Sequence, residues 1–252
     1  MTGPLVDHSR LLDTFAAEGE RLASSAAGAD PRLDVPFCPG MQLGDLVRHV
    51  GSFYWMVLSW IGDGNRPTRW QRSPLPGQPV EDYLRDGQAA LLAELSAHAP
   101  DEGCPTWWPI QQNYGFWYRR VAHETTIHRI DVQQAVVGMV VGGIAEDIAL
   151  DGIDEILTLW FTHRLKVLGV TNAGQGRVSV RAGSRHWIAQ LRPDSTTAWR
   201  ADPGDPADAV VSSDPTGMYR WLWGRWPPAM INSTGDARAV AQLWNMLRLA
   251  TH

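Results

Sequence analysis

The sequence predicts a mainly α-helical protein, with a helical bundle over residues 1–170 followed by a small α+β domain over residues 171–252. Two patterns predict this fold class. In the first two-thirds of the chain, apolar residues recur at three- and four-residue spacings, which is typical of amphipathic helices. After Gly169 they alternate with polar residues, which is typical of strands. We expect the domain boundary near residues 168–176, in the glycine-rich stretch between the two patterns.

The first part is expected to contain five helices, at about residues 6–26, 42–61, 79–98, 115–137 and 147–168. Leucine, phenylalanine and alanine at mixed spacings of three and four give the first helix an apolar face. The second helix is nearly all apolar from Val50 to Ile61, so we expect it to be buried on several sides. Long polar loops at 62–79 and 99–114 flank the third helix, and loops of this length often cover functional sites.

The second part is expected to be built from strands and two helices. Alternating segments predict strands at residues 177–181, 186–191, 197–200 and 209–212. Asp214 precedes a helix that runs through Trp223, and its carboxylate can accept a backbone N–H at the helix start. The sequence Ser-Thr-Gly-Asp at 233–236 opens a final helix at about 236–249.

The composition is that of an ordinary globular protein, with 252 residues of which 44% are apolar and 19% are charged. The net charge of −5 gives no basic surface for a nucleic acid. No apolar run is long enough to span a membrane, and the first residues lack the pattern of a signal peptide. Two cysteines, Cys38 and Cys104, do not make a disulfide framework. We therefore expect a cytoplasmic protein without nucleic-acid or membrane partners, and the sequence does not indicate its oligomeric state.

The main functional signal lies on the expected helix 115–137, where Glu124 and His128 are four residues apart. Residues at this spacing lie on nearly the same face of a helix, so a carboxylate and an imidazole are stacked one turn apart. The pair makes half of a metal site. His123 and His128 are five residues apart, about 140° around the helix, and they cannot share one ion.

His49 is the expected third ligand, on a second helix that is otherwise apolar. Facing helices of a bundle often build metal sites together. Two histidines and one carboxylate leave a coordination position open, which is the composition of a catalytic zinc site rather than a structural one. The alternative for His49 is a core histidine that hydrogen-bonds a backbone carbonyl.

Asp131 lies three residues after His128 and seven after Glu124, so it shares their face of the helix. We expect Asp131 to orient a metal ligand or to bind the substrate. The alternative is a buried salt bridge with an arginine such as Arg48 or Arg120.

These residues belong to a wider pattern that resembles a known family. The pattern contains Cys38-Pro39-Gly40, Leu46 and His49, then Arg119-Arg120-Val121-Ala122-His123-Glu124 and His128-Arg129-Ile130-Asp131, with Leu222-Trp223-Gly224-Arg225 and Thr234-Gly235-Asp236 near the end. It resembles the mycothiol-dependent maleylpyruvate isomerase family, within the DinB-like metalloenzyme superfamily, over nearly the whole chain. The resemblance implies a DinB-like up-down bundle in which His49, Glu124 and His128 hold zinc. It also implies mycothiol, a low-molecular-weight thiol, as cosubstrate.

The resemblance further implies an enzyme. Zinc would hold the thiol as a thiolate, which adds to a small electrophile. An isomerase would expel the thiolate again after rotation about the former double bond, whereas an S-transferase would release the adduct. No side chain of the protein need be the nucleophile. Cys38 and Cys104 are therefore expected to be bystanders, with Cys38 a small buried apolar residue.

Arginines are expected to bind carboxylates of the substrate, because their forked guanidinium groups suit such anions. The candidates are Arg66, Arg69 and Arg72 in the loop after the second helix, and Arg225 in the family-like segment of the C-terminal domain. Loop arginines are more often simply exposed to solvent. We expect Asp131 and Arg225 to act in catalysis or in binding the cosubstrate.

Two other functions stay open. The same ligands would let a metal-dependent hydrolase make hydroxide from zinc-bound water, although Glu124 as a ligand leaves no obvious separate base. A non-catalytic protein would keep the pocket to bind a small molecule, with the ligand residues as structural remnants.

Overall fold

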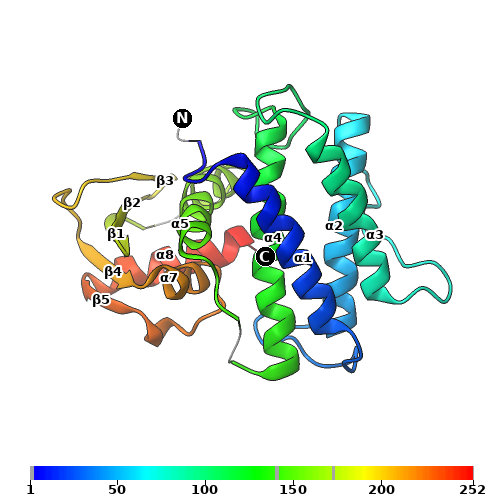
Figure 1. Cartoon of the computed structure of the whole chain (residues 1–252). Helices are drawn as coiled ribbons and strands as arrows, with labels where there is room; N and C mark the ends of the chain where they lie inside the picture. The colour runs from blue at the N-terminus through cyan, green and yellow to red at the C-terminus, as the bar shows by residue number, and fades with distance from the viewer. Residues whose placement is uncertain (1–2, 140–141, 172–173, 252) are drawn as a thin grey trace. The chain divides into compact units, whose positions relative to one another are not determined.

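The computed structural model describes residues 3–139, 142–171 and 174–251. The chain divides into two compact units. The N-terminal unit is Val6–Gly142. The C-terminal unit consists of the chain from Gly143 onward together with the few residues before Val6. The first is a bundle of long helices and the second is a small sheet with shorter helices (Figure 1). The predicted fold class is therefore confirmed.

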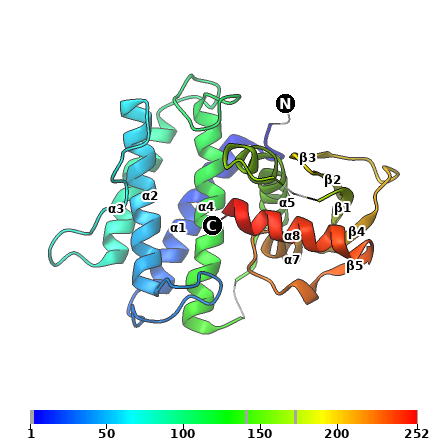
Figure 2. The ribbon, with the colours of Figure 1, turned by 180° about the vertical axis from the view of Figure 1, so that it is seen from behind.

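Within the described residues of the N-terminal unit, the helices are α1 (His8–Ala26), α2 (Leu43–Asp63), α3 (Val80–Ser96) and α4 (Tyr114–Val137). Their bounds agree with the predicted ones to within a few residues. α1 packs along α4 and α2 packs along α3, while α1 also meets α3 and α2 also meets α4. The views from both sides show these helices running alongside one another (Figures 1 and 2).

α2 and α3 follow one another in the chain, yet they run in the same direction, so the expected up-down order of the bundle is wrong for this pair of helices. Gly51 of α2 lies against Leu84 of α3, and Trp55, one turn later, lies against Gly87. A Cβ atom at Gly87 would lie 3.3 Å from the Gly51 carbonyl oxygen, so the two glycines allow a close approach. The loop at 64–79 permits this arrangement, because it can span roughly 50 Å when extended, about twice the length of α3.

α4 runs antiparallel to α2, and this direction decides which of their residues meet. Near one end of the pair, the rings of Trp60 and Trp117 lie 5.8 Å apart. Further along, the rings of His49 and His128 lie 5.3 Å apart. Residues almost eighty positions apart in the chain are therefore neighbours in the bundle. The side chain of Asn113 accepts the N–H of Phe116 and begins α4 at the position that this arrangement needs.

A buried ion pair joins α1 to α4. Nε of Arg129 donates to Oε2 of Glu18 at 2.6 Å, and both side chains are almost completely buried. Nη1 of Arg129 also donates to the side chain of Gln133 and to the carbonyl oxygen of Gly142. A buried charge is tolerated only when it is paired and hydrogen-bonded, so Glu18 and Arg129 depend on each other.

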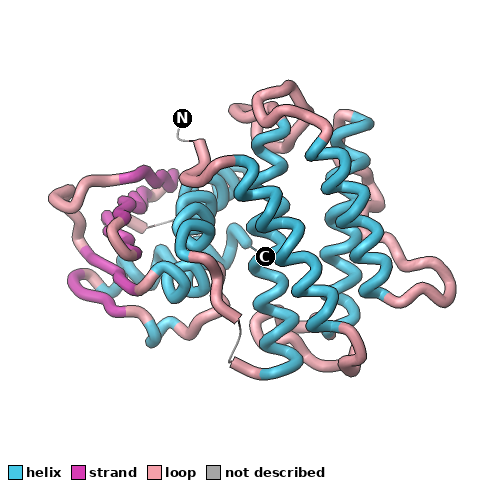
Figure 3. Tube along the Cα trace, in the orientation of Figure 1, coloured by secondary structure: helices cyan, strands magenta, loops and turns pink. Residues whose placement is uncertain are grey.

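The C-terminal unit begins with α5 (Glu146–Glu155), which continues as a π-helical stretch (Ile156–Arg164) and a last turn, α6 (Leu165–Val167). Its described residues also form the strands β1 (Gly176–Ala182), β2 (Arg185–Arg192), β3 (Ser195–Arg200), β4 (Ala209–Ser213) and β5 (Asn232–Gly235). The sheet order is β3-β2-β1-β4-β5. β1 and β4 are parallel, and the other neighbouring strands are antiparallel. α7 (Pro215–Leu222) and α8 (Ala237–Thr251) pack against this sheet (Figure 3).

The four predicted strands of this unit are confirmed, and so is the cap of α7, where the Asp214 carboxylate accepts the N–H of Gly217 at 2.9 Å. β5 was not predicted, because Asn232–Gly235 is polar and too short for alternation to be visible. Its strand conformation comes from pairing with β4. Within the described ranges, none of the helices has the length and apolar character that a membrane span requires.

The structure divides at residues 142 and 143, whereas the sequence predicted a boundary near residue 170. The reason is Asp154 on α5, which binds the sheet. Its carboxylate accepts the indole N–H of Trp187 at 2.9 Å and two N–H groups of Arg200 at 2.7 and 2.9 Å. These contacts join α5 to β2 and β3. A change of periodicity marks the end of a helix, but only such contacts show to which unit the helix belongs.

We predict that Glu18→Ala lowers the free energy of unfolding by about 3–5 kcal/mol, because it leaves the Arg129 guanidinium buried without its carboxylate. Glu20→Ala is the matched control on the same helix. Glu20 pairs with Arg85 at the surface, so its loss is expected to cost at most about 1 kcal/mol. Urea denaturation of both variants measures the difference, and equal costs would contradict the assignment of the buried pair.

Candidate metal centre

His49, Glu124 and His128 lie together in the N-terminal unit. Nε2 of His49 is 3.7 Å and Nε2 of His128 is 3.2 Å from the same oxygen, Oε1 of Glu124. One possible ligand atom from each residue lies within 4.8 Å of the others. The structure thus brings the three predicted ligands to one point, and their role in holding a metal stays a prediction.

Other side chains hold the opposite atoms of these groups. Arg120, one turn before Glu124, donates from Nη2 to Oε2 of Glu124 at 2.9 Å. On the other side, Nδ1 of His128 lies 2.9 Å from Oδ2 of Asp131, which is fully buried. The carboxylate of Asp131 can only accept this hydrogen bond, so Nδ1 is the donor and carries a proton. Nε2 of His128 and Oε1 of Glu124 are left facing His49.

The electrostatics of the site keep Glu124 ionised. Burial raises the pKa of Glu124, but hydrogen bonds from His128 and His49, with the charges of His128 and Arg120, outweigh burial and hold the pKa well below its usual range. Burial lowers the pKa of His128, but its hydrogen bonds and the charges of Asp131 and Glu124 raise the pKa to about 9. Without a bound cation, His128 is therefore positively charged, and His128 and Arg120 together supply the positive charges that face the two carboxylates.

The donor set fits a zinc ion. Two imidazole nitrogens and one carboxylate oxygen are ordinary zinc ligands, and a set of three leaves room for a further ligand. Metal-binding histidines usually donate their second N–H to a carboxylate or a carbonyl, as His128 does to Asp131. Arg120 fixes the orientation of the Glu124 carboxylate in the same way. Oriented donors with their ligand atoms facing one point are what an ion of this kind requires.

The loop after α2 covers the His49 side of the site. The ring of Trp70 meets His49 edge to face, with centroids 5.3 Å apart. The guanidinium group of Arg66 lies 5.3 Å from the centre of the Trp70 ring, in a cation–π contact. Ser52 of α2 anchors the loop, since its hydroxyl bonds both the N–H and the carbonyl oxygen of Arg72 at 3.0 Å. An aromatic ring thus lies beside His49, and an exposed cationic group lies against that ring.

Cys38 is part of the polar network of this site, and the expectation that it is a buried apolar residue is wrong. The residue is only partly buried, and its thiol donates to Oδ2 of Asp131 at 3.5 Å. Cys38, Asp131 and His128 form a second group whose possible ligand atoms all lie within 4.8 Å of one another. Cys104, in contrast, is buried, and burial raises the pKa of its thiol to about 11.

Arg225 lies in the C-terminal unit, after α7. It is buried, and its Nη1 donates to the carbonyl oxygen of Trp223 at 2.7 Å. Its charge adds to the effect of burial on Arg248, whose pKa falls to about 9. The predicted role of Arg225 in catalysis or cosubstrate binding stays a prediction, and so does that of the loop arginine Arg69.

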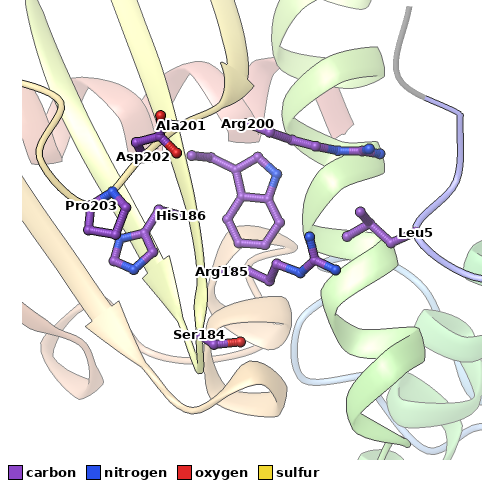
Figure 4. Close-up of a pocket in the computed structure, with 9 residues that line it drawn as sticks. Leu5, Ser184, Arg185, His186, Arg200, Ala201, Asp202 and Pro203 are labelled. Atoms are coloured by element: carbon purple, nitrogen blue, oxygen red, sulfur yellow. The ribbon is translucent and has the colours of Figure 1, made fainter.

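A cavity of about 180 Å³ lies in the C-terminal unit, at the ends of β2 and β3 (Figure 4). It is lined by Leu5, Ser184, Arg185, His186, Trp187, Arg200, Ala201, Asp202 and Pro203. The guanidinium group of Arg200 is already engaged with Asp154. None of the predicted site residues lines this cavity.

Sequence reasoning missed three contributors to the site. The sequence offers Arg120 as a partner of Asp131, but its position four residues before Glu124 is the signal for a helical ion pair with Glu124 instead. Trp70 gave no signal beyond its place in a long loop, because nothing in the sequence says where a loop folds back. Cys38 gave a weak signal, its place in the family-like pattern, but no spacing rule relates it to Asp131, 93 residues later.

Two family models match the chain. The first, described as the mycothiol maleylpyruvate isomerase N-terminal domain, matches residues 12–133, and the second, described as the MDMPI C-terminal domain, matches residues 147–242. Together they cover most of the chain, so it belongs to the mycothiol maleylpyruvate isomerase family. The predicted family is confirmed, and with it the prediction that the chain is an enzyme. No curated protein matches the chain.

Two solved structures resemble the chain over almost its full length. A crystal structure of the mycothiol-dependent maleylpyruvate isomerase has a TM-score of 0.63 at 18% identity, covering 94% of this chain and 98% of that one. A crystal structure of a histidine-to-alanine mutant of the mycothiol-dependent maleylpyruvate isomerase has a TM-score of 0.61 at 16% identity, with the same coverage. At these identities the likeness concerns the fold.

We predict that Asp131→Asn weakens zinc binding about 10–100-fold, because an amide holds the Nδ1–H of His128 less strongly than a carboxylate does. Asp86→Asn, at an exposed position of α3, is the control for loss of one carboxylate. Competition with a chromophoric chelator measures both affinities. Unchanged affinity in Asp131→Asn would contradict the orienting role.

We also predict that binding of a cation at pH 7 releases about one proton. The pKa of His128 is raised to about 9, so its imidazole is protonated at pH 7 and must lose a proton to become a ligand. The affinity should fall about tenfold for each pH unit below 9 and level off above it. Calorimetry in buffers of different ionisation enthalpy counts the protons, and a count that is the same at pH 7 and pH 10 would disprove this.

Proposed function

We propose that this protein is a zinc-dependent enzyme that uses mycothiol as cosubstrate and acts on a small electrophile, as an isomerase of the maleylpyruvate type or as an S-transferase. The observation that carries the proposal is the convergence of His49, Glu124 and His128 on one point. Family membership supports the thiol, since the matching domain model is named for mycothiol. The similar solved structures are of an isomerase that depends on the same thiol.

A zinc ion bound by these residues would lower the pKa of a thiol bound to it, so that the thiol is a thiolate at neutral pH. The protein's own residues would prepare this chemistry. Asp131 keeps the His128 proton on Nδ1, and Arg120 occupies the second oxygen of Glu124. Two of the three ligand atoms, those of His128 and Glu124, are therefore oriented before any ion arrives, which reduces the reorganisation needed for binding.

The second substrate would be held by cationic groups. A thiolate that adds to the electrophilic carbon of an unsaturated acid transfers negative charge toward the substrate's carbonyl and carboxylate oxygens. Arginine forks stabilise such oxygens through paired hydrogen bonds. We propose Arg66, which lies against Trp70 beside His49, and Arg225 for this role. Expulsion of the thiolate after bond rotation gives an isomer, and release of the adduct gives a transferase product.

The hydrolase alternative has less support. A zinc hydrolase needs a base that takes a proton from the attacking water. The carboxylate of Glu124 faces both histidines and Arg120, and that of Asp131 accepts from His128 and Cys38. Both acids of the site are thus engaged in holding other groups.

We predict that the purified protein contains about one zinc per chain, and that His49→Ala removes it. Thiol-dependent turnover should then fall at least about a hundredfold, because a bound metal contributes several kcal/mol to such chemistry. Metal analysis and mass spectrometry of thiol adducts, with a panel of unsaturated acids, measure the two effects.

The controls separate metal from substrate binding. His98→Ala changes a histidine that pairs with Glu94 and Glu102 at the surface, and it should keep both zinc and turnover. Arg225→Ala should keep zinc and lose turnover. A protein that stays active without metal would refute the proposal, and thiol-independent cleavage of esters or amides would favour the hydrolase.

A further inference from the structure

A second set of donors lies next to the candidate zinc ligands and shares one residue with them. Cys38, Asp131 and His128 place a sulfur, a carboxylate oxygen and a ring nitrogen within 4.8 Å of one another. Sγ of Cys38 is 3.5 Å and Nδ1 of His128 is 2.9 Å from the same oxygen, Oδ2 of Asp131. The three residues come from two segments: Cys38 lies in the loop before α2, and the other two lie on α4.

The two donor sets use opposite sides of the His128 ring. In the first set Nε2 of His128 faces Oε1 of Glu124, and in the second Nδ1 faces Oδ2 of Asp131. A neutral imidazole has one lone pair available for a metal, on the nitrogen that carries no proton. A cation on Nδ1 therefore leaves the proton on Nε2, which then cannot bind a cation in the first set.

We propose that Cys38, Asp131 and His128 form a second cation site, for thiophilic ions such as Cd²⁺, and that this site and the candidate zinc site are not occupied together. The donor chemistry selects the ion, because a thiolate prefers soft metals, whereas the first set offers only nitrogen and oxygen. Cys38 is only partly buried, and it lies in a loop rather than in a helix. Asp131 is fully buried and supplies a fixed anionic oxygen.

Each proton released when a cation binds at the second site can be accounted for. Starting from the metal-free protein, the Cys38 thiol loses its proton to solvent and a sulfur–metal bond forms. His128 gives up the proton on Nδ1 to solvent, keeps the proton on Nε2 and binds the cation through Nδ1. Oδ2 of Asp131 loses the two hydrogen bonds that it accepted from Cys38 and His128 and binds the cation in their place. No electron is transferred. The binding itself does not depend on the proposed function, and only the exclusion of zinc rests on it.

The test uses two variants that each remove one site. Cd²⁺ is added to the wild-type chain, to Cys38→Ser and to His49→Ala, and the absorbance of the thiolate-to-cadmium charge transfer is recorded. The wild type and His49→Ala should both show the band at one equivalent. Cys38→Ser should lose the band and bind Cd²⁺ at least about tenfold more weakly. Cys104→Ser is the control for the second thiol and should keep the band.

The prediction that the two sites are not occupied together is tested on the zinc-loaded protein. A zinc-sensitive dye should report about one zinc released for each thiolate–cadmium bond formed, and the release should need at least about tenfold more Cd²⁺ in Cys38→Ser. Loss of the band in His49→Ala, or its persistence in Cys38→Ser, would overturn the second site. Formation of the band with zinc fully retained would overturn the exclusion. If the wild type holds no zinc but shows the band, the proposed function fails and the second site stands.

Discussion

The hydrogen bond between Nδ1 of His128 and Oδ2 of Asp131 is the interaction on which the site depends. It fixes the proton of the imidazole on one nitrogen and so decides which nitrogen faces Glu124 and His49. The bond lies in the interior, where Asp131 has no exposed surface, so water does not compete for it. The same oxygen also accepts the thiol of Cys38, and a single carboxylate thereby controls both donor sets.

The bundle supplies the position of these groups. α2 and α4 are antiparallel, which places His49 beside His128 rather than beside a residue nearer the start of α4. Glycines at the α2–α3 contact let those helices approach, and the buried pair of Glu18 and Arg129 joins α1 to α4. A site made from two helices keeps its geometry only if the helices hold their register, and the buried hydrogen bond between the hydroxyls of Tyr54 on α2 and Thr125 on α4, at 2.7 Å, joins these two helices directly.

Much of the fold could be predicted from the sequence, because it follows from local periodicity. The helix ranges and four of the strands depend on which residues are apolar at which spacing. The pair of Glu124 and His128, with Asp131 one turn on, is fixed by helix geometry alone. The choice of His49 as third ligand came from its polar character in an apolar helix, and the structure brings it to the other two.

Other features were decided only by tertiary structure, because they join segments that no local rule relates. The parallel course of α2 and α3, the place of α5 with the sheet and the pairing of β5 with β4 all depend on long-range contacts. Trp70 and Cys38 reach the site from loops, and a loop's path follows from what it packs on. The sequence by itself therefore determined the elements and the chemistry on one helix face. Tertiary packing decided which distant side chain joins them, since only the folded chain sets distances between residues far apart in sequence.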